Sequence, residues 1–257
     1  MKKLIIIQIL FCFIQIANAQ SAKTNLKEFG LKGKVKEVIL YEYRAEINKM
    51  KVDTLHHPFK TIMKFDEKGN LTEEYTFDKN EKLAAKTLYD YKKDGSITKN
   101  IFDPMNKLLD SAILKYDSIG RQIESDSYYR INFLKTVYKY DEAGNQIEEA
   151  NYLQSGSLTI KYAYAFNEKN QKVGQKSYWH DGKQTDESIF KYDALGNLIK
   201  TETYNLDGKI VGGNTAIYTN IDKDGNWLSE EFEYTGHSQM QGDFLFKHVD
   251  KRVIEYY

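Results

Sequence analysis

Three pairs of adjacent glutamates are the residues of this sequence that could most readily do chemistry. The pairs are Glu73-Glu74, Glu148-Glu149 and Glu230-Glu231. Two carboxyl groups flanking a sugar bond form the catalytic pair of most glycosidases. Neighbouring residues of a strand point to opposite faces, however, and the pairs recur at one place in a repeat, which a single active site does not require. The sequence therefore favours solvated strand faces that discourage edge aggregation.

Metal and nucleophile signatures are weak in this sequence. His56 and His57 could bind one ion only from a loop, and no third ligand follows at a recognisable spacing. Asp222 begins an Asp-Lys-Asp-Gly stretch that matches only half of a calcium loop and is interpreted as a turn. The G-x-S-x-G, H-E-x-x-H and phosphate-loop patterns do not occur. We therefore expect no catalytic residue, no metal and no cofactor.

Aromatic residues are dense enough to support binding. The chain has 20 tyrosines, and Tyr178, Trp179 and His180 lie together in one expected turn, with Trp227 beside another. An exposed ring can stack on the apolar face of a sugar. For most tyrosines the stronger alternative is a face that holds neighbouring hairpins together. For Trp179 the two alternatives stay open.

The N-terminus indicates export. Lys2 and Lys3 precede an apolar run from Leu4 to Ile16, and Ala17-Asn18-Ala19 forms a cleavage site. This pattern predicts a signal peptide over 1–19, too short to span a membrane, and no later stretch is apolar enough to do so. The only cysteine, Cys12, lies inside it. The mature chain is expected in the periplasm, on the cell surface or outside the cell, without disulfides.

Charge gives no reason to expect nucleic acid as a partner. The chain carries 37 basic and 37 acidic residues. Loss of Lys2 and Lys3 leaves 35 against 37, which favours neither nucleic acid nor an anionic membrane. The expected partners are a glycan or a cell-envelope protein.

A turn motif repeats along the chain. It reads aromatic, Asp or Asn, two variable residues, Gly, then Asn or Arg, at intervals of about 25 residues, the signature of a repeat architecture. The residue expected to take positive φ in each copy is glycine, except in the fifth, where asparagine is the next-best choice. These structural turn residues are Gly69, Gly95, Gly120, Gly144, Asn170, Gly196 and Gly225.

A second turn follows each of the first six copies, so each unit is one β-hairpin. The stretch from Leu158 to Phe166 alternates apolar or aromatic residues with smaller and polar ones, as a strand does. The fold class predicted is all-β, an antiparallel meander of tandem hairpins that forms an elongated, twisted or curled sheet or solenoid. The expected parts are an N-terminal capping strand and loop (20–58), hairpin repeats (59–234) and a C-terminal cap (235–257).

The repeated Tyr-Asp-x-x-Gly-Asn/Arg pattern resembles the YD-repeat (RHS-type) family of bacterial exported proteins, from about Phe59 to Phe232. Long members of that family wrap strands into a shell around a toxin cargo. This chain is more similar to short, signal-bearing members of the Bacteroidetes, which are often labelled carbohydrate-binding. The resemblance implies an exported, non-enzymatic binding or scaffold module at the cell envelope. The alternative is a polysaccharide-active hydrolase on a β scaffold.

Overall fold

A computed structural model describes residues 26, 29–45, 47–48, 51–52, 58–129, 132–238 and 242–257. The predicted signal peptide and the adjacent His56 and His57 lie outside these residues. Most of the strands have six to nine residues and follow one another at hairpin spacing. They are β1 (Val35–Ala45), β2 (Ile47–Asn48), β3 (Lys51–Val52), β4 (Phe59–Phe65), β5 (Leu71–Phe77), β6 (Leu83–Tyr91), β7 (Ile97–Phe102), β8 (Leu108–Tyr116), β9 (Gln122–Tyr129), β10 (Asn132–Tyr140), β11 (Gln146–Leu153), β12 (Leu158–Phe166), β13 (Lys172–Trp179), β14 (Gln184–Tyr192), β15 (Leu198–Asn205), β16 (Ile210–Ile221), β17 (Trp227–Ser238) and β18 (Gly242–Tyr256).

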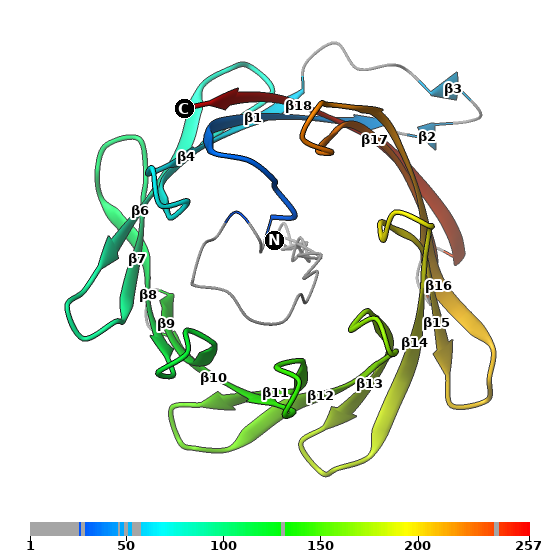
Figure 1. The fold of residues 1–257 in the computed structure, drawn as a ribbon. Coiled ribbons are helices and arrows are strands. Elements are labelled where there is room, and N and C mark those ends of the chain that lie inside the picture. Colours follow the sequence, from blue (N-terminus) through cyan, green and yellow to red (C-terminus); the bar gives the residue numbers. More distant parts are fainter. Residues whose placement is uncertain are drawn as a thin grey trace, which may run out of the picture.

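Sixteen of these strands close into one antiparallel barrel (Figure 1). Strands β4 to β18 pair in sequence order, and β1 fills the seam between β18 and β4, while β2 and β3 pair separately. The prediction of an all-β antiparallel meander is confirmed. The prediction of an elongated open sheet or a solenoid is wrong, because the first and last strands of the barrel are hydrogen-bonded to each other.

Closure has two physical causes. An open sheet would leave the edges of β1 and β18 unpaired, and their pairing from Val35–Tyr256 to Ala45–Lys247 removes both edges. Curvature comes from register shifts repeated next to the turns, as between Lys139 and Tyr140 or Ala165 and Phe166. Bulges of this kind bend a strand and increase its twist. Repeated around the meander, they bring its two ends together.

The seven predicted turn residues all have positive φ, from 58° at Asn170 to 89° at Gly120 and Gly196. The turn from Asp141 to Asn145 illustrates the geometry. The Gly144 amide donates to the Asp141 carbonyl at 3.1 Å, and the Asn145 amide donates to Asp141 Oδ1 at 2.8 Å. Asn145 Nδ2 donates to the other carboxylate oxygen at 2.9 Å. Aspartate and glycine therefore hold the hairpin by complementary means.

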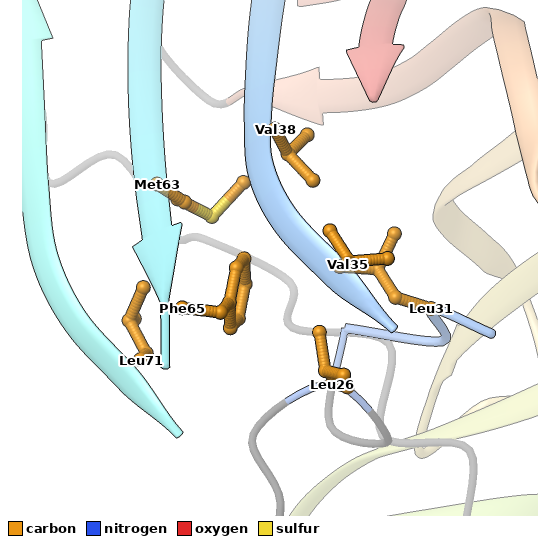
Figure 2. Close-up of a cluster of buried hydrophobic side chains, with 7 residues drawn as sticks. All are labelled: Leu26, Leu31, Val35, Val38, Met63, Phe65 and Leu71. Carbon is orange, nitrogen blue, oxygen red and sulfur yellow. The ribbon is translucent and has the colours of Figure 1, made fainter. Parts of the chain in front are cut away.

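The described N-terminal segment, Leu26 and residues 29–34, lies inside the ring of strands as drawn in Figure 1. Its Leu26 and Leu31 pack with Val35, Val38, Met63, Phe65 and Leu71 in a cluster of buried apolar side chains (Figure 2). Backbone contacts fasten the segment to the turns. The Lys32 amide donates to Asn226 Oδ1 at 2.7 Å, and Asn226 Nδ2 donates to the Lys32 carbonyl at 3.0 Å. The segment thus covers part of the barrel end that carries the repeated turns.

Candidate functional site

The inner and outer walls of the barrel can be assigned from its register. Val38 and Met63 are cross-strand partners that pack against the N-terminal segment, so both face inward. Directly opposed residues of neighbouring strands share a face, and residues two apart on a strand do so too. Following these pairs around all sixteen strands returns to Met63 on the same face. The assignment is therefore consistent around the closed ring.

The outer wall carries lysine–carboxylate pairs. They join neighbouring strands, as in Lys139–Glu148 at 2.7 Å and Lys191–Glu202 at 3.1 Å. The outer pairs between neighbouring strands include Lys64–Glu73, Lys115–Glu124, Lys115–Asp126, Lys135–Glu124, Lys139–Glu148, Lys161–Glu148, Lys176–Glu187, Lys191–Glu202 and Lys247–Glu233. Such pairs are well solvated and each contributes little to stability.

The inner wall contains a second set of glutamates with different partners. Glu149 lies opposite Tyr138 and Tyr162, and the Tyr164 hydroxyl donates to Glu149 Oε2 at 3.1 Å. Burial raises the pKa of Glu149, against the opposing effects of the hydrogen bond from Tyr164 and the charge of Lys172. The Lys172 ammonium lies 4.7 Å from the Tyr164 ring centroid. A carboxyl, a phenol and a cation thus meet at one place.

The same arrangement occurs earlier in the chain. The Tyr89 hydroxyl donates to Glu74 Oε2 at 3.5 Å, and Lys99 lies 5.8 Å from the Tyr89 ring centroid. Burial raises the pKa of Glu74, and the charge of Lys99 opposes it. Both glutamates precede their tyrosine by 15 residues, so the glutamate and the tyrosine occupy equivalent positions in the repeat, while the lysine comes from a different position in each group.

A third group lies near the end of the chain. Burial raises the pKa of Glu230, while the charge of Arg252 and a hydrogen bond with Tyr218 lower it. The Arg252 guanidinium stacks on Trp227, with Cζ 3.4 Å from the ring centroid, and burial lowers its pKa to about 10. Nε and Nη1 of Arg252 are buried and have no hydrogen-bond partner among the described residues. Asp250, opposite Glu230, adds a second carboxylate here.

We call these groups the three triplets: Glu74–Tyr89–Lys99, Glu149–Tyr164–Lys172 and Glu230–Tyr218–Arg252. The prediction that adjacent glutamates face opposite ways is confirmed, since Glu73 and Glu148 pair with outer lysines while Glu74 and Glu149 face inward. The prediction that these glutamates are solvated is wrong for Glu230, which is buried, while Glu74 and Glu149 are part-buried on the inner wall. Closure of the sheet gives them an enclosed face that an open sheet lacks.

The four predicted binding residues do not form one site. Tyr178 lies under Lys161 on the outer wall, with the ammonium 5.0 Å from the ring centroid. Trp179 is 54% exposed and His180 is exposed, both at the turn that follows β13. Trp227 lies at the opposite end, just after a repeated turn, in contact with Tyr218 and Arg252. A sequence signal exists only for the first two triplets, in the shared spacing of 15 residues between Glu and Tyr.

The described part of the chain has neither a metal-ligand cluster nor a membrane-spanning helix. There, no group of three or more His, Cys, Asp or Glu side chains is arranged to hold a metal ion. Asp222 lies in a hairpin turn, where its Oδ1 accepts from the amides of Asp224 and Asn226. Within the same residues, no helix has the length and apolar character to cross a membrane.

Comparison with known proteins identifies the fold. No family model matches the chain, and no curated protein matches it. A porin-like protein from Bacteroides uniformis has a similar structure, with a TM-score of 0.58 over 87% of this chain and 98% of its own. The barrel is porin-like in fold. The sequence identity is 12%, so the likeness concerns the fold alone. A porin-like protein from Bacteroides vulgatus matches less well, with a TM-score of 0.41, 12% identity and coverage of 74% of this chain and 95% of its own.

The resemblance to the YD-repeat (RHS-type) family is therefore wrong as an assignment. The closed sixteen-strand barrel and its porin-like structural neighbour overturn it. The physical reason lies in the motif. Aspartate and a positive-φ glycine specify a tight hairpin turn, which any antiparallel meander of short hairpins can use. The motif reports the turn and not the way in which the hairpins assemble.

Proposed function

We propose that this protein is an exported barrel that stands in water and binds a glycan on its inner wall without catalysing a reaction. The observation that carries the proposal is the division of chemistry between the two walls. The outer wall carries paired lysines and carboxylates, while the inner wall combines tyrosine rings with carboxyl groups and cations.

The outer wall argues for an aqueous setting. A barrel embedded in lipid needs an outward apolar band about 25 Å tall, and a lysine at the bilayer midplane costs about 2–4 kcal/mol. Here lysine–glutamate pairs such as Lys135–Glu124 and Lys161–Glu148 lie along the strands on the outside. A charged wall of this kind favours water over hydrocarbon. The predicted signal peptide supports export.

The width of the barrel argues for an internal ligand. At roughly 4.8 Å between strands and a tilt of roughly 40°, sixteen strands give a backbone diameter of roughly 30 Å. Side chains do not fill a barrel of this size. Glu149, Tyr164 and Lys172 are only part-buried, which is typical of a wall that solvent reaches.

The chemistry of the inner wall favours a glycan over an apolar ligand. A tyrosine ring offers a stacking surface, and the neighbouring carboxyl and ammonium groups accept and donate hydrogen bonds with sugar hydroxyls. An apolar ligand would leave these groups desolvated and unpaired, which is costly. Glu149 has its own tyrosine and cation, Tyr164 and Lys172, an arrangement that supports binding more than an acid–base pair of carboxyl groups does.

Hydroxyl-radical footprinting tests this proposal. Residues 20–257 are mixed with envelope polysaccharide from a bacterium that encodes the protein, and oxidation is read by mass spectrometry. We expect protection of the inner Tyr164 and Tyr138 but not of the outer Tyr178 and Tyr75. Protection of Tyr178 alone would move the contact outside the barrel. Cleavage of the polysaccharide would favour the hydrolase alternative and contradict the proposal.

A further inference from the structure

The three triplets lie at one level of the barrel and are spread around it. Their glutamates are on β5, β11 and β17, six strands apart along the meander, and β17 is four steps from β5 across the seam. On β6, the residue opposite Glu74 of β5 is Thr87, and the residue opposite Lys99 of β7 is Tyr89, two positions further along the strand. On β10, the partner likewise changes by two positions, from Thr136 opposite β9 to Tyr138 opposite Glu149 of β11. A regular stagger of this kind compensates for the strand tilt of a barrel. The triplets therefore lie around the inner wall at about the same height along the barrel axis.

The triplets are too far apart to form a single pocket. Six strands along a barrel roughly 30 Å wide separate neighbouring triplets by roughly 20 Å or more. One sugar ring cannot contact two groups at that distance. Each triplet also contains a complete set of binding groups: a ring, an acceptor and a donor.

From this placement we propose that the inner wall holds three separate glycan-binding subsites, one at each triplet, and that the ligand class is a neutral oligosaccharide. The inference rests on the proposed function and deepens it. Each triplet combines a glutamate with a cation, Lys99, Lys172 or Arg252, and two of these cations also face a further carboxylate, Lys99 facing Asp110 and Arg252 facing Asp250. A neutral hydroxyl-rich ligand suits such a site better than a uronic acid or a sulfated sugar.

The unsatisfied groups of Arg252 support the third subsite. Its buried Nε and Nη1 have no hydrogen-bond partner among the described residues, and leaving such donors unpaired is unfavourable. A sugar hydroxyl could accept from them after a small shift of the side chains. Asp250 makes this subsite more acidic than the one at Glu149, so the affinities of the two should differ.

Three linked subsites also imply a dependence on ligand size. A short oligosaccharide binds each triplet independently. A chain long enough to span roughly 20 Å can occupy two triplets at once, and its second contact then benefits from a high effective concentration. Weak individual subsites are therefore compatible with tight retention of a polysaccharide.

Native mass spectrometry tests the inference by counting bound ligands. The probes are neutral trisaccharides of glucose, xylose and N-acetylglucosamine, and residues 20–257 should bind up to three copies of at least one. Glu149→Gln should weaken one subsite roughly fivefold to tenfold and lower the saturated count toward two. Glu148→Gln, its neighbour on the outer wall, is the matched control and should retain three. Glu74→Gln with Glu73→Gln repeats the comparison, with melting temperatures confirming that each variant folds.

The outcomes separate the inference from the proposed function. A maximum of one ligand, or a count unchanged in Glu149→Gln and Glu74→Gln, overturns the three subsites but leaves an internal glycan site intact. Preference for anionic sugars overturns the ligand class. If neither the trisaccharides nor the envelope polysaccharide bind, the proposed function fails together with the inference.

Discussion

At the scale of single residues, the turn glycines carry the most local information in the chain. Gly144 has a φ of 86°, and an added Cβ would meet no other atom within 4 Å, so only the backbone resists substitution there. Gly144→Val should lower the free energy of unfolding by about 1–2 kcal/mol, because a β-branched residue resists the left-handed region. Gly144→Asn is the matched control and should cost less, as Asn170 occupies the same position of its own turn at 58°. Thermal melting of both variants measures the difference, and equal shifts would contradict the account of the turn.

The inner glutamates make a second prediction at this scale, concerning pH. Burial raises the pKa of Glu149, so its carboxyl holds a proton more tightly in the folded than in the unfolded chain. The resulting stabilisation is complete below the unfolded pKa and is lost as the pH rises through the folded pKa. The melting temperature of Glu149→Gln relative to the wild type should therefore increase between pH 4 and pH 8. Glu73→Gln, on the outer wall, should show the opposite trend, because the hydrogen bond from Tyr75 lowers the pKa of Glu73, and a parallel trend in both variants would contradict the assignment of the walls.

At the scale of elements, the N-terminal segment is held by a small apolar cluster. Leu31 is 5% exposed within this cluster, whereas Leu195, in a turn, is 78% exposed. Leu31→Ala should lower the free energy of unfolding by about 2–4 kcal/mol through lost burial and a cavity. Leu195→Ala should change it by less than about 0.5 kcal/mol. Denaturant titration of the two variants compares them, and similar values would mean that the segment does not pack as described.

The seam between β1 and β18 is a second element that can be tested. Ile39 and Val253 are directly opposed on the outer wall, although 214 residues separate them in the sequence. Ile39→Cys with Val253→Cys should form a disulfide on mild oxidation and stabilise the fold by about 2–4 kcal/mol. Ile39→Cys with Ile217→Cys, on a non-adjacent strand, should not. Non-reducing electrophoresis after proteolysis reads the result, and an absent first disulfide would indicate an open meander.

The sequence predicts the elements well because their signals are local. Alternation from Leu158 to Phe166 separates the inward Ile160, Tyr162 and Tyr164 from the outward Lys161, and aspartate with a positive-φ residue marks each repeated turn. Closure has no local signal, since it depends on small bends added over sixteen strands and on a pairing between the two ends of the chain. The sequence does not predict the triplets either, because the enclosed environment of Glu149 exists only once the barrel is closed.

At the scale of the whole molecule, the central feature is a closed barrel with chemically different walls. The predicted signal peptide contains the only cysteine of the chain, so residues 20–257 offer a background free of thiols. Single cysteines can therefore be placed on either wall without further changes. Glu148→Cys and Glu149→Cys put a thiol on adjacent residues that face opposite sides of β11.

The most direct test of the account is the labelling rate of these two thiols with a small maleimide and with a maleimide attached to a polymer too large to enter the barrel. Glu148→Cys should react with both reagents, while Glu149→Cys should react with the small reagent and at least tenfold more slowly with the large one. Envelope polysaccharide should slow labelling only at Glu149→Cys. Equal rates with the large reagent at the two positions would contradict the closed barrel. Protection at Glu148→Cys instead of Glu149→Cys would contradict binding on the inner wall.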